Sequence, residues 1–255
     1  MKISDNIEII NPHSNKPLRI PVEELDTDYG KMLILGAETN QRHALQNTKK
    51  AYDHEEVTAL DNIVKKITNP VFFDIGSNFG VFTLGLAKTV SENGGYIHTF
   101  EPQRIVYNCL VGSIALNGYD NIYTYNVAIG KSELEYIELP NFDYTQPCSF
   151  GSIEFGENQI ESLQQKRKTE NKKEYVKIIS LDSFIGKIDK LDLIKIDVEG
   201  MEESVLESAE QIIKKYKPII FVEYLKSSPE KLYDRIVGWG YTKIFKMGVN
   251  FLCTE

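Results

Sequence analysis

The seven residues from Asp74 to Gly80 have the composition of a ligand-binding turn. They read DIGSNFG and lie between an apolar run at 71–75 and a helical pattern that begins near Val81. Glycine lets the backbone turn sharply and approach a ligand without a Cβ atom in the way. Glu101 ends the next apolar run, 27 positions after Asp74, where a carboxylate can accept hydrogen bonds from both hydroxyls of a ribose. These residues together predict a binding site for a ligand that contains a nucleoside.

The spacing of this turn distinguishes two nucleoside cofactors. A nicotinamide dehydrogenase needs G-x-G-x-x-G, which brings two backbone amides onto a pyrophosphate, whereas Asn78 stands where the middle glycine would be. The carboxylate of Asp74 is unfavourable beside a pyrophosphate and favourable beside the sulfonium and ammonium groups of S-adenosylmethionine (SAM). We therefore expect SAM as the cofactor. An NAD-dependent oxidoreductase and a non-catalytic binding module stay as alternatives, because both would share the strand, turn and helix.

A pair of acidic residues, Asp197 and Glu199, follows the apolar run at 191–197. A hydroxyl group that accepts a methyl group must lose its proton, and a carboxylate whose pKa is raised by burial can take it. The pair could instead bind Mg²⁺, which prefers oxygen ligands and lowers the pKa of a bound hydroxyl. Both residues also suit the start of a helix near Met201. Glu223, which ends a later apolar run, is a weaker candidate of the same kind.

Short β-branched and aromatic runs alternate with helix-length amphipathic stretches through most of the chain. This alternation is typical of a parallel sheet covered by helices. The expected strands are 71–75, 96–101, 122–127, 191–197 and 218–223, with a closing antiparallel pair at 241–246 and 249–253. The expected helices include 51–66, 201–216 with one apolar stripe, and one that begins at Pro229 after the cap residue Ser228.

The first 50 residues do not show this alternation. We expect an N-terminal extension over 1–50, with a hairpin of strands 7–10 and 18–22 and a further strand at 31–35. The domain that carries the nucleoside-binding site is then expected to span 51–255.

A long insert interrupts the alternation at about 134–180. A connection of this length is usually functional, and ligands of open α/β sheets bind outside the carboxyl ends of the strands. We therefore expect a substrate-facing lid with extra strands at 134–139 and 175–181. Its basic run, 164–177, predicts either a solvated segment or a docking patch for an anionic substrate.

The composition is that of a globular protein with an acidic balance. The 255 residues carry a formal net charge of −8, which disfavours non-specific binding to nucleic acid. Three well-separated cysteines argue against structural zinc and an obligatory disulfide. No run approaches the ~20 apolar residues of a membrane span, and the first residues lack a signal-peptide pattern. We expect a cytoplasmic protein that acts on a small molecule or a glycan, and no pattern predicts its oligomeric state.

Six segments of the chain resemble the FkbM-type family, a branch of the class I SAM-dependent methyltransferases. In family order they are FFDIGSNFGVFT (72–83), HTFEPQ (98–103), NVAIG (126–130), SLDSF (180–184), LIKIDVEGMEESVLESA (193–209) and KPIIFVEY (217–224). The resemblance implies an α/β fold, a Rossmann-like sandwich with helices on both faces of a seven-stranded, mostly parallel sheet whose last strand is antiparallel. It also implies SAM as the cofactor.

The resemblance assigns residues to the cofactor. It places the methionine part of SAM against Asp74, Gly76, Asn78, Gly80 and Thr83. Glu101 would bind the ribose and Pro102 would shape the turn after it. The adenine would lie beside Asn126, Val127 and Ala128.

The resemblance also points to the acceptor. Asp197 and Glu199 would meet it near the methyl group, and Met201, which stands where the family commonly has alanine, would change a pocket wall or its packing. Enzymes that methylate nucleic-acid bases carry Asn/Asp-Pro-Pro-aromatic at this place, where this chain has Asp-Val-Glu-Gly. The family implies O-methylation of a hydroxyl in a sugar, a glycan or a secondary metabolite, which is an inference by analogy.

Overall fold

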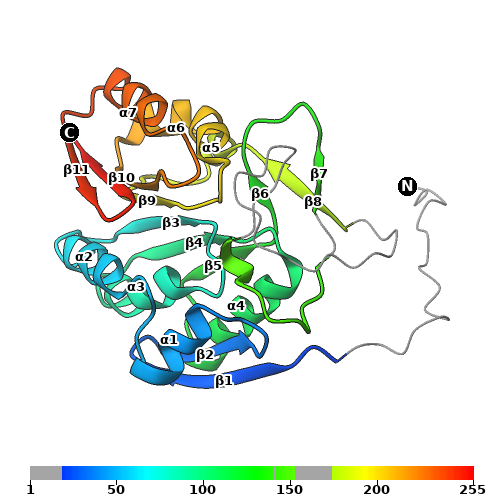
Figure 1. The fold of residues 1–255 in the computed structure, drawn as a ribbon. Helices are drawn as coiled ribbons and strands as arrows, with labels where there is room; N and C mark the ends of the chain where they lie inside the picture. The colour runs from blue at the N-terminus through cyan, green and yellow to red at the C-terminus, as the bar shows by residue number, and fades with distance from the viewer. Residues whose placement is uncertain (1–18, 140–141, 153–173) are drawn as a thin grey trace, which may run out of the picture.

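The computed structural model describes residues 19–139, 142–152 and 174–255, and its largest element is a seven-stranded sheet (Figure 1). The strand order is β11-β12-β10-β9-β3-β4-β5. The parallel strands are β3 (Val71–Ile75), β4 (Tyr96–Phe100), β5 (Ile122–Tyr125), β9 (Leu193–Ile196) and β10 (Ile219–Glu223). The last strand, β12 (Asn250–Thr254), is antiparallel to β10 and to β11 (Lys243–Met247). The expected fold class is confirmed.

Helices cover both faces of the sheet, as Figure 1 shows. One face packs against α2 (His54–Val64), α3 (Val81–Glu92) and α4 (Arg104–Asn117), and the other packs against α5 (Glu202–Ser208), α6 (Glu210–Tyr216) and α7 (Pro229–Gly238). Successive strand residues point to opposite faces. Phe72 therefore joins the first core, whereas Phe73 joins the second.

The N-terminal region forms a hairpin that differs in position from the expected one. β1 (Val22–Thr27) pairs with β2 (Gly30–Leu35), and β2 packs on α4. The expected strand at 31–35 is confirmed, but the expected strand at 18–22 is wrong because residues 19–21 are not in a strand. Pro21 has no N–H to donate to a ladder. The expected strand at 7–10 lies outside the described residues.

Two helices near this hairpin differ from expectation. α1 (Gln41–Thr48) was not predicted, and it buries only Leu45, so its apolar pattern is too weak to detect. α2 begins at His54 rather than at residue 51.

The expected helix at 201–216 is two helices that meet at Ala209. Asp182 explains the break, because its carboxylate accepts hydrogen bonds from the backbone N–H groups of Gln211 (3.3 Å) and Ile212 (2.8 Å) in the first turn of α6. Ser180 also donates its hydroxyl to the carbonyl of Ser208 at 2.7 Å. Both partners come from a segment distant in sequence, so a local pattern cannot reveal them.

The insert contributes a small second sheet. β6 (Ala128–Ile129) pairs with β8 (Glu174–Ile179), and β8 pairs with β7 (Tyr136–Leu139). The two expected insert strands are thus present. Short 3₁₀ turns occur at Phe150–Ser152 and Leu181–Phe184. Most of the basic run, 164–173, lies outside the described residues. Among the described helices, none is long and apolar enough to cross a membrane.

The capping of α6 by Asp182 predicts a loss of stability when the carboxylate is removed. We expect Asp182→Ala to lower the free energy of unfolding by about 1 kcal/mol, because helix-capping side chains contribute about 0.5–2 kcal/mol. Urea unfolding followed by circular dichroism measures the change. Asp234→Ala is the matched control, because Asp234 is exposed on α7 and its carboxylate forms no hydrogen bond or ion pair with the described residues. Equal stability of the two variants would contradict the assignment of Asp182 as the cap.

Candidate active site

The carboxyl ends of β3, β4, β9 and β10 bring polar residues together on one side of the sheet. Because side chains alternate along a strand, Asp74 of β3 lies on the same face as Lys195 of β9, its partner in the register. Asp197 continues that face beyond β9, and Glu223 occupies it at the end of β10. A ligand-binding crevice is expected at this edge of an open α/β sheet.

The turn after β3 is held tightly against its neighbours. The backbone N–H groups of Gly76 and Ser77 both donate to the carbonyl of Phe100 at 3.0 Å. Gly76 has a φ of +76°, and a Cβ atom there would lie 1.8 Å from the carbonyl oxygen of Asp197. The turn therefore packs directly on the loop after β9, and a larger residue at 76 would separate them.

Glu101 anchors the turn from the end of β4. It is 3% exposed, and its carboxylate accepts hydrogen bonds from the backbone N–H groups of Asn78 (2.9 Å) and Gln103 (2.8 Å). Burial raises the pKa of Glu101 to about 7, and these two hydrogen bonds oppose the rise. Each carboxylate oxygen has a further lone pair for a ligand hydroxyl.

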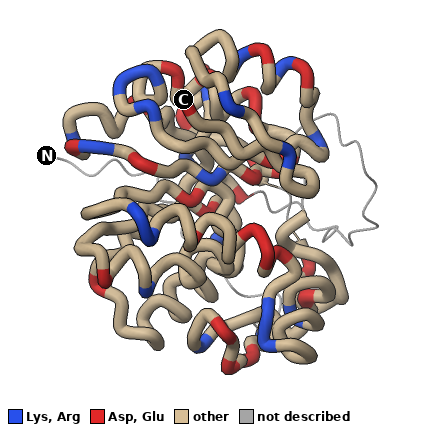
Figure 2. The backbone as a smooth tube through the Cα atoms, turned by 90° about the vertical axis from the view of Figure 1, so that its left-hand side faces the viewer, with Lys and Arg blue, Asp and Glu red and all other residues tan. Residues whose placement is uncertain are grey.

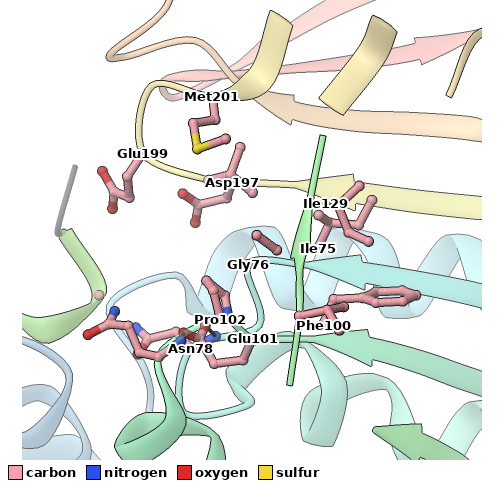
Figure 3. Close-up of a pocket in the computed structure, with 15 residues that line it drawn as sticks. Ile75, Gly76, Asn78, Phe100, Glu101, Pro102, Ile129, Asp197, Glu199 and Met201 are labelled. Atoms are coloured by element: carbon pink, nitrogen blue, oxygen red, sulfur yellow. Dashed lines mark hydrogen bonds between the residues drawn. The ribbon is translucent and has the colours of Figure 1, made fainter. Parts of the chain in front are cut away.

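A narrow pocket opens between this turn and the loop after β9. Figure 3 shows Asp197, Glu199 and Met201 on one side of it and Asn78, Glu101 and Pro102 on the other. The apolar side chains in the lining are Ile75, Phe100, Val127, Ile129 and Met201. Gly151 of the insert also lines the pocket, and a Cβ atom there would lie 2.1 Å from the amide nitrogen of Asn78.

The structure places the expected cofactor residues in two layers. Six line the pocket: Gly76, Asn78, Glu101, Pro102, Val127 and Ala128. The other four support it: Asp74, Gly80, Thr83 and Asn126. The amide of Asn126 donates to the carbonyls of Glu101 (2.8 Å) and Pro102 (3.0 Å) and so fixes the turn after β4. The roles assigned to all ten stay predictions.

Asp74 lies beneath the pocket and is completely buried. It accepts a hydrogen bond from the hydroxyl of Thr83 at 2.6 Å and lies 3.6 Å from the ammonium of Lys195. Burial raises the pKa of Asp74, while Lys195 and Thr83 oppose the rise.

Lys195 is the main functional residue that sequence reasoning missed. It is 3% exposed, and its ammonium donates to the carbonyl of Gly76 at 2.9 Å and lies 3.4 Å from Asp197. Burial alone would lower the pKa of Lys195, but the carboxylates of Asp197 and Asp74 outweigh it and raise the pKa. The signal was a single lysine inside the apolar run LDLIKID, since charged residues are rarely buried without a partner.

A second missed residue, Glu202, shapes the loop after β9. It is 1% exposed, and its carboxylate accepts hydrogen bonds from the N–H groups of Val198 (3.0 Å) and Gly200 (3.2 Å) and from the hydroxyl of Ser227. Glu199, between these two amides, has a φ of 56°, in the left-handed region. Glu202 thereby stabilises the turn that carries Asp197 and Glu199.

Three carboxylates converge where the strands end. Asp197, Glu199 and Glu223 each place one oxygen within 4.8 Å of the others. Glu199 also forms an ion pair of 2.7 Å with Lys226. Burial, followed by the charge of Asp197, raises the pKa of Glu199 to about 7 and that of Glu223 to about 9. This spread of pKa values in one cluster is typical of sites that transfer protons.

A larger cavity of about 510 Å³ adjoins the narrow pocket. The two share Gly76, Asn78, Gly151, Asp197 and Glu199 in their walls. In Figure 2, several Asp and Glu segments gather near the centre of the molecule, and six carboxylate residues line this cavity. The geometry thus provides two adjoining compartments with a shared acidic wall.

Several solved methyltransferase structures are similar to this chain. No curated protein matches the chain. Among solved structures, methyltransferase FkbM from Methylobacillus flagellatus KT is 18% identical with a TM-score of 0.49, and the match covers 73% of this chain and 44% of that one. A SAM-dependent O-methyltransferase from Thermotoga maritima is 8% identical with a TM-score of 0.45, over 88% and 66% of the two chains.

A further similar structure contains bound S-adenosyl-L-homocysteine. The Pyrococcus abyssi tRNA (uracil-54, C5)-methyltransferase in complex with S-adenosyl-L-homocysteine is 11% identical with a TM-score of 0.45, over 91% of this chain and 43% of that one. The model of the methyltransferase FkbM domain matches residues 74–242, which include both sides of the pocket. This chain therefore belongs to the FkbM family of methyltransferases.

Proposed function

We propose that this protein is a SAM-dependent methyltransferase that methylates a hydroxyl oxygen of a sugar, a glycan or another small metabolite. The observation that carries the proposal is the pair of adjoining compartments with Asp197 and Glu199 in their shared wall. A cofactor in the narrow pocket and an acceptor in the larger cavity would meet beside these carboxylates. The class of acceptor follows from the family by analogy.

The residues of the narrow pocket fit SAM chemically. Apolar walls at Phe100, Val127 and Ile129 suit an adenine ring, and the carboxylate of Glu101 suits the ribose hydroxyls. The amide oxygen of Asn78 is buried and has no hydrogen-bond partner among the described residues, so it is available to a donor such as the ammonium of the methionine part. The acidic wall suits the positive sulfonium.

The proposed mechanism uses the carboxylates as proton acceptors. Bound SAM would supply a methyl group on a positively charged sulfur. The acceptor oxygen would attack the methyl carbon in line and displace that sulfur, which leaves as S-adenosylhomocysteine. The protein would hold that oxygen about 3–3.5 Å from the methyl carbon, which is the main source of acceleration in such a reaction. Asp197 or Glu199 would take the hydroxyl proton. The salt bridge to Lys195 keeps the Asp197 side chain in position at the shared wall.

A divalent cation is the alternative to direct proton removal. Asp197, Glu199 and Glu223 offer three oxygen ligands within 4.8 Å, and such ligands suit Mg²⁺. A bound ion would lower the pKa of the acceptor hydroxyl. Turnover in the presence of a chelator distinguishes the two mechanisms.

The proposed role of Glu101 predicts weaker cofactor binding when its charge is removed. We expect Glu101→Ala to weaken S-adenosylhomocysteine binding by at least about tenfold, because hydrogen bonds to a charged group contribute about 1.5–3 kcal/mol. Isothermal titration calorimetry measures the dissociation constant. Glu101→Gln keeps the side-chain size and an acceptor oxygen for one of the two N–H groups of Asn78 and Gln103, so it distorts the turn less than Glu101→Ala and should give an intermediate loss.

The matched control for Glu101 is Glu133→Ala, because Glu133 is exposed and does not line the pocket. That variant should bind S-adenosylhomocysteine like the native protein. Native affinity in folded Glu101→Ala would remove Glu101 from the proposed ribose site.

The proposed role of Asp197 predicts a loss of turnover without a loss of cofactor affinity. We expect Asp197→Asn to reduce turnover at least ~100-fold and to change S-adenosylhomocysteine affinity by no more than about threefold. The assay follows S-adenosylhomocysteine formation with an acceptor from a screen of hydroxylated sugars and metabolites, with and without EDTA.

Asp189→Asn makes the same chemical change at an exposed loop position and should keep native turnover. If Asp197→Asn turns over at the native rate, Asp197 is not the base. If that variant instead fails to bind S-adenosylhomocysteine, Asp197 is a cofactor-binding residue.

A further inference from the structure

Acidic side chains outnumber basic ones in the described lining of the larger cavity, which indicates the kind of acceptor that it binds. Six carboxylate residues line it: Glu38, Asp53, Glu56, Asp197, Glu199 and Glu223. They come from the loop after β2, the start of α2, the loop after β9 and the end of β10. The only cationic residues in the described lining are Lys195 and Lys226.

Neither lysine is free to pair with an anionic ligand. The ammonium of Lys195 is held by Asp74, Asp197 and the carbonyl of Gly76. Lys226 is 6% exposed, lies 2.7 Å from Glu199 and donates to the carbonyl of Ser152 at 3.0 Å. Within the described lining, a phosphate or carboxylate in this cavity would therefore meet acidic groups without a compensating cation.

The carboxylates differ in how much of their charge is already compensated. Glu38 accepts hydrogen bonds from three backbone N–H groups, and Asp53 accepts one from the side chain of Gln41 at 2.6 Å. Within the described part of the chain, the carboxylates of Glu56 and Glu223 form no hydrogen bond or ion pair. Both are only partly exposed. Burial raises the pKa of Glu223 to about 9, so this group keeps its proton at neutral pH until a cation reaches it and favours the ionised form.

Glu223 lies beside the atoms proposed to carry the chemistry. One of its oxygens is within 4.8 Å of oxygens of Asp197 and Glu199. A ligand group that pairs with Glu223 would thus lie close to a hydroxyl held at Asp197. Amide side chains in the same lining, Asn40, Gln41 and Asn250, can hydrogen-bond to further hydroxyls.

We propose that the acceptor carries a protonated amine next to the hydroxyl that is methylated, and that Glu223 and Glu56 bind this amine. The substrate class is then a hydroxylated amine such as an amino sugar, in preference to a sugar phosphate, a sugar nucleotide or a nucleic acid. This inference rests on the proposed function, because it takes the larger cavity as the acceptor site.

The test compares acceptors that share a framework and carry a positive, a neutral or a negative substituent. The SAM-product complex is titrated with triplets of an amine, its N-acetyl derivative and a phosphorylated counterpart, built on hexose, aminocyclitol and linear amino-alcohol frameworks. The hexose triplet is glucosamine, N-acetylglucosamine and glucose 6-phosphate. We expect the amine to bind at least about tenfold more tightly than its N-acetyl derivative on the framework that fits, and the phosphate to bind most weakly.

Single-residue variants test which side chains cause the preference for the amine. Glu223→Gln and Glu56→Gln should each reduce the preference for the amine while S-adenosylhomocysteine affinity stays native, because neither residue lines the narrow pocket. Glu55→Gln is the matched control, since Glu55 is the exposed neighbour of Glu56 on α2 and does not line the cavity. It should keep the full preference.

Each other outcome has a defined meaning. Tightest binding by a neutral or phosphorylated member, or binding by no amine, would overturn the inference. The same holds if added Mg²⁺ makes the phosphorylated member bind best, because the carboxylates would then serve a divalent cation. Failure of the native protein to bind S-adenosylhomocysteine in the first step would instead overturn the proposed function.

Discussion

The rest of the site depends on the contacts that the buried ammonium of Lys195 makes. It lies between Asp74 and Asp197 and also binds the carbonyl of Gly76. One side chain therefore connects β3, β9 and the turn after β3, which lines the narrow pocket. Without it, the fully buried carboxylate of Asp74 would have no cation beside it among the described residues, and removal of one partner from a buried ion pair typically costs about 3–5 kcal/mol.

The alternation of side chains along the strands explains why the other functional groups gather at the same place. Asp74, Lys195 and Glu223 lie on one face of three adjacent strands, and all three strands end at the same edge. The loop after β9 then adds Asp197 and Glu199, which separate the narrow pocket from the larger cavity. In the proposed function, the same few residues would position a cofactor, an acceptor and a proton acceptor relative to one another.

Sequence patterns predicted the sheet well because they record local burial. Runs of β-branched and aromatic residues marked the five parallel strands and the antiparallel closing pair, and the turn at Gly76 marked the pocket. The features that were missed depend on contacts between distant segments. The break at Ala209 requires Asp182, the pairing of Lys195 requires β3 beside β9, and the six carboxylates of the larger cavity come from four separate parts of the chain. The placement of Asp74 beneath the pocket, paired with Thr83, also follows from tertiary packing.

The most direct test of the central claim is a parallel thermal-shift titration of the native protein with SAM, S-adenosylhomocysteine and NAD. A ligand at 100 times its dissociation constant stabilises the folded state by about 2.7 kcal/mol, and each kcal/mol shifts the midpoint by roughly 2–4 °C for a chain of this size. The account predicts a saturable increase with both adenosyl ligands and none with NAD. An increase with NAD alone, or with none of the three, would contradict it.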